Sequence, residues 1–370
     1  MQDTQKGCLA RERYRSMLSF RRIAGICLFS VCLVAVTSCG IFPTGKLSYA
    51  AEGTDPLASY LQLGDTDPVL DPSIIRQGSA YYAFSTDVAE FPGNGNIPIH
   101  CSQDKVTWTA CGSVFPDGMP AWIRQRVPGV IGLWAPDISY FNGEYHLYYN
   151  GSKLHTQQTV IGLATNTTLD PTDPAYKWID RGMVLQSKKG DDFNALDPTI
   201  LIDSDKKVWL TYGSYWSGIK QRQIDAASGM LLASNRTRYD LATRPGIPNN
   251  PIEGASLIRH GKYYYLFVSV DYCCEQNNAH NNYKQAVGRS ITPHGPFVDE
   301  NGTRMMNGGG TVLLKGNSTW NAPGGGTALF DSENSESLIV FHAHNLEKSN
   351  VPYQWVKTLK WENDWPMIGN

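Results

Sequence analysis

One short pattern occurs five times along this chain, with steps of 64, 62, 56 and 69 residues between the first positions of the copies. After each of the first four copies come a short apolar run, a polar turn and an aromatic-rich run such as 263–266. A repeat of this length with several strands is typical of β-propellers. We therefore predict an all-β, five-bladed β-propeller over residues 65–370, without helices. The copies begin with Asp71-Pro72, Ala135-Pro136, Asp197-Pro198, Glu253-Gly254 and Ala322-Pro323.

Three of the five copies carry a carboxylate at their first position. The innermost strand of each propeller blade starts beside the central channel, so Asp71, Asp197 and Glu253 are expected to face one funnel. Glycosidic bond cleavage needs one carboxylic acid to protonate the leaving oxygen and one carboxylate to activate water or attack. A third acid raises the pKa of a neighbour by like-charge repulsion. The alternative is structural, because Asp-Pro pairs also start turns.

The composition excludes some classes of partner. Charged residues make up 18% of the chain, aromatic residues 11%, and the formal net charge is −2. This balance suits a β-rich core with stacking surfaces. Because no Lys/Arg-rich run occurs outside the N-terminus, nucleic acid is not an expected partner. Nothing in the sequence points to an oligomer, so a monomer is expected.

The N-terminus is predicted to be a targeting segment. Arg21-Arg22 precede an apolar run over 23–36, which is too short for a spanning helix and suits a signal peptide over 1–38. Small residues followed by Cys39 resemble a bacterial lipobox, which makes Cys39 the predicted lipidation site. Residues 39–64 are then the lipidated cysteine and a flexible tether. The protein is expected to be exported to the bacterial cell envelope, touching membrane only through the lipid; the alternative is an ordinary secretory signal.

The remaining cysteines form two pairs. Export permits disulfides, and Cys101 and Cys111 are spaced to staple a hairpin or to remain free. Cys273 and Cys274 are adjacent, so a bridge between them would be strained and two free thiols are favoured.

Several separate stretches resemble glycoside hydrolase family 43, and most of all its endo-1,5-α-L-arabinanases. The resemblance covers about residues 65–367. It is carried by Leu70-Asp71-Pro72-Ser73, Leu133-Trp134-Ala135-Pro136-Asp137, Ala195-Leu196-Asp197-Pro198, Gly213-Ser214-Tyr215-Trp216-Ser217-Gly218-Ile219, Ile252-Glu253-Gly254, Val268-Ser269-Val270-Asp271-Tyr272-Cys273-Cys274 and Gly308-Gly309-Gly310-Thr311.

This resemblance implies a five-bladed propeller and an inverting hydrolase of α-1,5-L-arabinofuranosyl linkages in arabinan. Carried over by position, Asp71 is the general base, Glu253 the general acid, and Asp197 the residue that orients the acid and raises its pKa. In an inverting enzyme the base and the acid are expected to lie roughly 6.5–9.5 Å apart. The chemistry itself requires no cofactor.

Two positions depart from the family. Leu70 stands where a His often precedes the first Asp, and Gly325 replaces a fifth-blade His that lies near the channel and holds a metal ion, often calcium. A structural calcium is therefore in doubt, and the metal ligands are unknown. His342 and His344 are available near the fifth blade, but packed or surface positions are favoured for both.

Four further residues are expected to bind sugar. Trp134 and Trp216 flank the motifs and are suited to stacking on sugar faces, although packing in the core is the alternative. Ser214 and Asn150 are expected to hydrogen-bond hydroxyl groups. Two other functions stay open on the same fold: an exo-acting α-L-arabinofuranosidase or β-xylosidase, and a glycan-binding propeller without catalysis.

Overall fold

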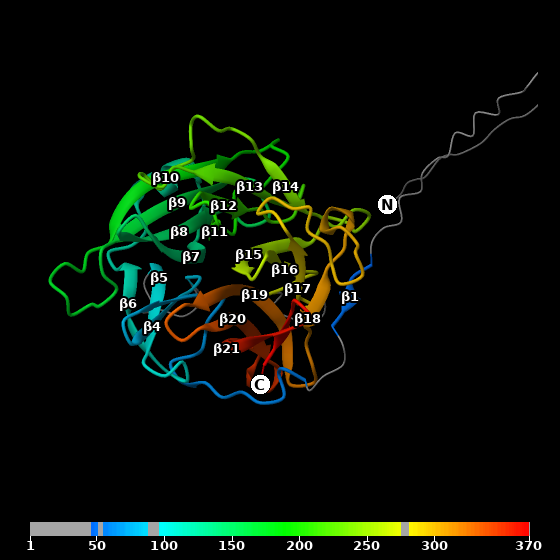
Figure 1. The fold of residues 1–370 in the computed structure, drawn as a ribbon. Coiled ribbons are helices and arrows are strands. Elements are labelled where there is room, and N and C mark those ends of the chain that lie inside the picture. The colour runs from blue at the N-terminus through cyan, green and yellow to red at the C-terminus, as the bar shows by residue number, and fades with distance from the viewer. Residues whose placement is uncertain (1–45, 51–54, 88–95, 275–280, 370) are drawn as a thin grey trace, which may run out of the picture. The chain divides into compact units, whose positions relative to one another are not determined.

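Five sheets follow one another along the chain and lie around a common centre (Figure 1). The structure, a computed structural model, describes residues 46–50, 55–87, 96–274 and 281–369. These belong to the unit Pro43–Asn370. The predicted signal segment 1–38 and Cys39 lie outside the described residues.

Each sheet contains four consecutive antiparallel strands, and two of the sheets gain a short parallel edge strand. The strands are β1 (Ser48–Tyr49), β2 (Leu63–Gly64), β3 (Ser73–Gln77), β4 (Ala80–Phe84), β5 (Asn96–Ser102), β6 (Thr107–Phe115), β7 (Leu133–Phe141), β8 (Glu144–Ser152), β9 (Thr159–Asn166), β10 (Ile179–Ser187), β11 (Thr199–Ile202), β12 (Val208–Tyr212), β13 (Ile219–Ile224), β14 (Tyr239–Ala242), β15 (Ile252–His260), β16 (Tyr263–Val270), β17 (Lys284–Ser290), β18 (Thr311–Leu314), β19 (Trp320–Asp331), β20 (Glu336–Asn345), β21 (Val351–Glu362) and β22 (Trp365–Ile368).

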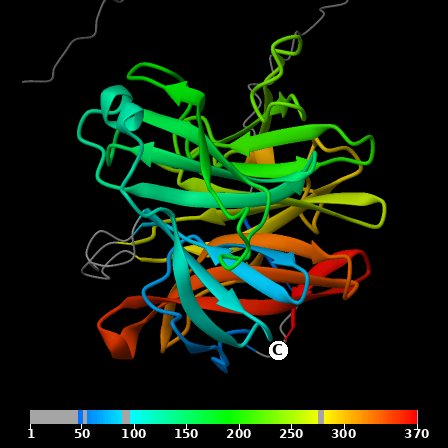
Figure 2. The same ribbon diagram turned by 90° about the vertical axis from the view of Figure 1, so that its left-hand side faces the viewer.

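The first strand of each sheet is the innermost, and these five strands close a ring. β3 contacts β7, β7 contacts β11, β11 contacts β15, β15 contacts β19, and β19 returns to β3. Figure 2, turned by 90°, shows the sheets one above another from green to red. The all-β, five-bladed propeller predicted from the repeat is confirmed.

Apolar side chains fill the five interfaces between neighbouring blades. Five buried clusters lie there, and each combines residues of two successive blades, the last joining blade five to blade one. Because each blade is covered on both faces, its second strand is apolar along nearly its whole length: in β16 every residue after Tyr263 is buried. This is why the aromatic-rich runs stand out in the sequence.

Polar side chains two positions into the repeat join neighbouring blades. The Ser73 hydroxyl accepts a hydrogen bond from the Ile138 amide at 3.1 Å, and Asp137 accepts one from the Ile200 amide at 2.9 Å. The ring closes where the Thr327 hydroxyl donates to the Pro72 carbonyl at 3.0 Å. Polar residues of the repeated pattern therefore have a structural function at these blade interfaces, apart from any chemistry.

The chain before the first blade packs on the propeller. β1 pairs with β18, β2 pairs with β6, and Leu57 is buried in the cluster between blades four and five. We expected a flexible tether over 39–64, but the described part of that segment is bound to the fold. Apolar residues of this segment, Leu57 among them, provide the contact.

The ends of the propeller chain meet through the backbone. The Val69 amide donates to the Pro352 carbonyl at 3.0 Å, and the Gln354 amide donates to the Thr66 carbonyl at 2.8 Å. The C-terminal strands themselves form the last blade, in the order β19-β20-β21-β22. The segment before the first blade is therefore hydrogen-bonded to β21 of the last blade.

One short helix contradicts the helix-free prediction. α1 (Ala121–Arg126) begins after Pro120 and buries Ile123 against the first two blades. Six residues are too few to show a helical period in the sequence. In the described part of the chain, no helix is long and apolar enough to cross a membrane.

A disulfide joins Cys101 to Cys111 across the β5–β6 hairpin. The sequence left open whether these two cysteines are bridged or free, and in the structure they are bridged. It lies in the first blade, on the strands next to the outer edge.

Candidate active site

A cavity of about 1410 Å³ opens at one end of the ring, and the three predicted acids all line it. Asp71, Asp197 and Glu253 come from three different blades. Below it, a small cavity of about 20 Å³ is lined by residues of all five repeat copies, which marks the propeller axis. The structure therefore brings the three carboxyl groups to one funnel, as the repeat predicted.

The acids do not all occupy the same position of the repeat. The residue that opens each inner strand has a left-handed backbone, with φ of +47° at Asp71, +39° at Ala135, +52° at Asp197, +56° at Gly254 and +48° at Ala322. In the fourth blade that position belongs to Gly254, and Glu253 precedes it. The same bulge, with one extra residue on the inner strand, follows Trp134 in the second blade and Asn321 in the fifth, so Glu253 is equivalent to these residues and stands one before the left-handed position. The prediction that Glu253 takes the same position of the repeat as Asp71 and Asp197 is therefore wrong by one residue.

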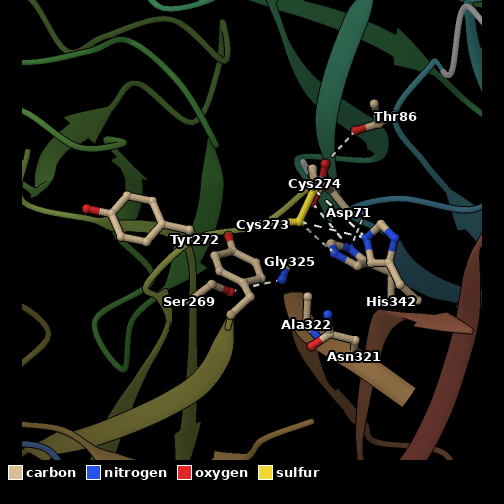
Figure 3. Close-up of a disulfide and its surroundings, with 12 residues drawn as sticks. Asp71, Thr86, Ser269, Tyr272, Cys273, Cys274, Asn321, Ala322, Gly325 and His342 are labelled. Atoms are coloured by element: carbon tan, nitrogen blue, oxygen red, sulfur yellow. Dashed lines mark hydrogen bonds and ion pairs between the residues drawn. A yellow bond between two sulfur atoms is a disulfide. The ribbon is translucent and has the colours of Figure 1, made fainter. Parts of the chain in front are cut away.

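Asp71 is held by two neighbours and keeps an accessible carboxylate. The Thr86 hydroxyl donates to its Oδ2 at 2.8 Å, while its backbone N–H donates to His342 Nδ1 at 3.1 Å (Figure 3). About a third of its side chain, 32%, remains exposed in the funnel. Burial raises the pKa of Asp71 to about 7; the Thr86 hydrogen bond opposes this and the charge of Glu253 adds to it. A carboxylate with such a pKa is suited to taking a proton at neutral pH.

His342 is buried beside Asp71, and its protonation follows from its partners. Because Nδ1 accepts the Asp71 amide proton, the ring proton lies on Nε2, which approaches Cys273 Sγ at 3.5 Å. Burial, and then the neighbouring His344, hold the pKa of His342 well below its usual value. The contact of 3.5 Å from Nδ1 to Asp71 Oδ1 is therefore not an ion pair. His342 is packed, as favoured, but also lies at the axis.

Glu253 accepts a hydrogen bond at each of its carboxyl oxygens. The Ser214 hydroxyl donates to Oε2 at 2.8 Å and the Tyr283 hydroxyl donates to Oε1 at 2.9 Å. Burial raises the pKa of Glu253, and these two hydrogen bonds oppose the shift. The carboxyl group thus has a fixed direction and an increased tendency to carry a proton.

Asp197 is anchored by the backbone. Its amide donates to Asn150 Oδ1 at 2.9 Å, and its Oδ2 accepts from the Gly254 amide, next to Glu253, at 2.9 Å. Burial, followed by the charges of Glu253 and Asp71, raises the pKa of Asp197 well above its usual value. Asp197 therefore sets the backbone that carries Glu253.

Three consecutive glycines of the fifth blade make room for this arrangement. A Cβ at Gly324 would lie 2.3 Å from the Tyr283 ring, and one at Gly325 would lie 2.2 Å from Asp71 Oδ1 and 2.8 Å from His342. The Gly325 amide donates to the Ser269 hydroxyl at 2.9 Å (Figure 3). The glycines let a blade without an acid of its own approach the acids of the others.

The four predicted sugar-binding residues divide into two groups. Trp134 and Trp216 line the cavity, and Trp216 is 40% exposed. Ser214 also lines it, although its hydroxyl is bonded to Glu253. Asn150 is fully buried and bonded to the Asp197 amide, so it cannot reach a sugar; this prediction is wrong. Asn150 lies on β8 opposite Trp134, and its side chain is directed at the third blade instead of the funnel.

The surroundings of Gly325 do not fit calcium. Calcium takes six to eight oxygen ligands, whereas the atoms nearest to Gly325 are the carboxylate of Asp71, already bonded to Thr86, and the imidazole of His342. Leu70, the second departure, lines the cavity with an apolar side chain. We therefore derive no step through a calcium ion.

Cys273 and Cys274 form a disulfide at the wall of the funnel, so the favoured pair of free thiols is wrong. Asp271, directly before the pair, is bound by Arg244 and Lys284. The Tyr272 amide donates to Asn282 Oδ1 at 3.0 Å. These contacts fix the backbone that precedes the bridge.

Thr86, Tyr283 and His342 were not identified from the sequence as residues that hold the acids. Thr86 follows an aromatic strand and Tyr283 precedes a strand, so neither belongs to the repeated pattern. The run Gly324-Gly325-Gly326 was a usable signal, because glycines that face a channel indicate that something else fills the space.

Comparison with known families and proteins agrees with the propeller fold. The model of glycosyl hydrolases family 43 matches residues 67–366. The extracellular endo-α-(1→5)-L-arabinanase 1 of Bacillus subtilis (strain 168) is 35% identical over 297 residues, which cover 80% of this chain and 86% of the relative.

Two solved structures share the fold with a TM-score of 0.75 and 36% identity each. They are a family 43 endo-arabinanase from Bacillus licheniformis and an exo-1,5-α-L-arabinanase from a bovine ruminal metagenomic library. In both cases the match covers 84% of this chain and 100% of the other.

Proposed function

Because the chain belongs to glycosyl hydrolases family 43, we propose that it hydrolyses α-1,5-L-arabinofuranosyl linkages in arabinan with inversion of configuration. The observation that carries this proposal is the meeting of Asp71, Asp197 and Glu253 in one cavity, each with its own hydrogen-bond partners.

Asp71 is the proposed general base. Thr86 occupies Oδ2, which leaves Oδ1 to take a proton from a water molecule. The water oxygen then bonds to the anomeric carbon while the glycosidic C–O bond breaks. The hydrogen bond from the Asp71 backbone amide to His342 keeps the residue, and with it the carboxylate, in place during this step.

Glu253 is the proposed general acid, which gives its proton to the leaving oxygen. The Ser214 hydroxyl rotates, so it is able to accept a hydrogen bond from protonated Oε2 as well as donate to ionised Oε2. Tyr283 holds the other oxygen. Asp197 positions the acid through the Gly254 amide, and its charge disfavours a second negative charge nearby.

The size of the cavity favours endo action. At about 1410 Å³ it exceeds the roughly 300–1,000 Å³ of typical small-molecule pockets, so several sugar residues fit at once. Trp134 and Trp216 are proposed to stack on these sugars. Exo-acting relatives of similar identity make single-sugar release the second candidate.

Product size tests the function. The purified protein is incubated with linear 1,5-arabinan, with and without EDTA, and the products are resolved by length and time. We expect short oligosaccharides early in the reaction, and rates within twofold in EDTA because the residues at Gly325 do not fit calcium. Arabinose alone from the start would establish exo action. Binding of arabinan without cleavage would establish a glycan-binding propeller.

We propose export of the protein to the cell envelope and anchoring through Cys39. Two relatives are described as extracellular, which supports export. The lipobox-like sequence before Cys39 supports the anchor. In an expressing bacterium, labelled fatty acid should enter the wild type, whereas C39S should remain unlabelled and leave the membrane fraction. Equal labelling of both proteins would exclude Cys39 as the anchor.

A further inference from the structure

His342 of β20 faces the Cys273–Cys274 disulfide at the wall of the funnel (Figure 3). His344 of the same strand lies close to the same two sulfurs. One potential ligand atom from each of Cys273, Cys274, His342 and His344 lies within 4.8 Å of all the others. Among the described residues this is the one such group of three or more His, Cys, Asp or Glu side chains. The catalytic proposal uses neither cysteine and does not use His344.

The hydrogen bonds of the two histidines give them different capacities. His344 Nδ1 lies 2.9 Å from the Asn350 carbonyl, which only accepts, so the ring proton is on Nδ1 and Nε2 carries a free lone pair. That lone pair points toward the sulfurs, 3.9 Å from Cys273 Sγ and 4.0 Å from Cys274 Sγ. Histidines that bind metals typically donate their other ring N–H to a carbonyl or carboxylate in this way.

His342 is oriented in the opposite sense. Its Nδ1 accepts the Asp71 amide proton, so Nε2–H faces Cys273 Sγ at 3.5 Å as a donor. It therefore supports a sulfur ligand by an N–H···S hydrogen bond and is not itself a ligand. The cluster thus offers two sulfurs and one imidazole nitrogen, with the remaining side open to the funnel.

We propose that reduction of the Cys273–Cys274 disulfide creates a zinc site whose ligands are Cys273 Sγ, Cys274 Sγ and His344 Nε2. A dithiol reductant supplies two electrons and two protons: the Cys273–Cys274 bond breaks, two thiols form, and the dithiol becomes a disulfide. Zinc then displaces the two thiol protons and binds the thiolates. Two Cys and one His with an open fourth position match a known class of zinc site.

The distances suit this metal. With Zn–S of about 2.3 Å and Zn–N of about 2.0–2.1 Å, neighbouring ligands of a tetrahedral ion lie about 3.5–3.8 Å apart. The nitrogen–sulfur distances of 3.9 and 4.0 Å require shifts of only a few tenths of an ångström. The large change is the separation of the two sulfurs, which reduction of the bond itself allows.

The site would link the redox state of the surroundings to access to the funnel. Cys273, Cys274, His344 and Asp71 line the same cavity. An ion there would fill part of the sugar path close to Asp71. We expect zinc to inhibit arabinan hydrolysis by the reduced protein and not by the oxidised protein. This consequence depends on the proposed function; the metal site does not.

Metal binding is tested on the full chain with Co²⁺ and Zn²⁺, before and after reduction and removal of the reductant under nitrogen. The reduced protein should bind one more equivalent than the oxidised protein and show a thiolate-to-cobalt charge-transfer band. C273S/C274S is the matched control, since it keeps every other cysteine, and it should lose that equivalent. H344Q should weaken binding at least about 10- to 100-fold.

Two results would overturn the proposal: no added equivalent on reduction, or equal affinity in H344Q. If H344Q does not fold, X-ray absorption of zinc in the reduced wild type decides the matter. Two sulfur ligands and one imidazole support the site, and any other set of protein ligands overturns it. Inhibition of hydrolysis is measured separately, so an inactive protein still tests the site.

Discussion

Replacing Glu253 by Gln will lower kcat on arabinan by about 10²- to 10⁴-fold, because an amide cannot protonate the leaving oxygen. Gln keeps the size of the side chain and one acceptor oxygen for the Ser214 or Tyr283 hydroxyl. The fold should therefore survive, and the loss should appear in turnover. Initial rates on linear arabinan, with thermal denaturation as a check on folding, measure the effect.

A substrate with a better leaving group distinguishes the role of the acid from that of the base. An aryl arabinofuranoside with an acidic phenol leaves without protonation, so E253Q should lose much less activity on it than on arabinan. D71N removes the acceptor for the proton of water and should stay inactive on both substrates. If E253Q were equally slow on both substrates, or D71N recovered on the aryl substrate, the assignment of acid and base would be wrong.

Replacing Gly325 by Ala will lower activity by about 10²-fold or more, because a Cβ there would lie 2.2 Å from Asp71 Oδ1. The flexible part of this contact is the carboxylate, which must turn away. A catalytic group displaced by about 1 Å commonly costs about 10²-fold. The Cβ cannot avoid Asp71 by moving toward His342, since two ring atoms of His342 would already be 2.8 and 2.9 Å from it.

Gly261 provides a matched control for the backbone. Both glycines have φ of +58°, but a Cβ at Gly261 meets nothing within 4 Å. G325A and G261A should each lose about 1–2 kcal/mol of stability from the left-handed backbone. Only G325A should lose turnover. Equal activity of the two variants would show that Gly325 serves the backbone alone and does not make room for the base.

The position of Glu253 shows where sequence spacing stops being informative. Counting residues placed Asp71, Asp197 and Glu253 in one phase, and they do face one cavity. Spacing alone could not show that Gly254, and not Glu253, takes the left-handed position of the fourth blade. The fourth copy lacks the proline that follows the first position in the other four copies, so it was aligned on its carboxylate alone.

The contacts that hold the acids are long-range and therefore invisible in the repeat. Asp71 depends on His342 through a bond that spans 271 positions, and Glu253 depends on Tyr283 from the edge of a later strand. Asn150 was expected at the sugar, but the ring directs its side chain to the Asp197 amide. Closure of the ring decides the first of these partners, because it brings the fifth blade against the first. The other two depend on packing within the fourth blade and between the second and third blades.

The sequence by itself determined the number of blades, the strands within them and the identity of the three acids. These depend on a period, on alternation and on residue type, all of which act locally along the chain. Tertiary structure alone decided the partners and protonation of each acid, the space cleared by Gly324 and Gly325, and the disulfide that faces His344. Such features arise only when five blades close around one axis, because burial and hydrogen-bond geometry are then set by residues from other blades.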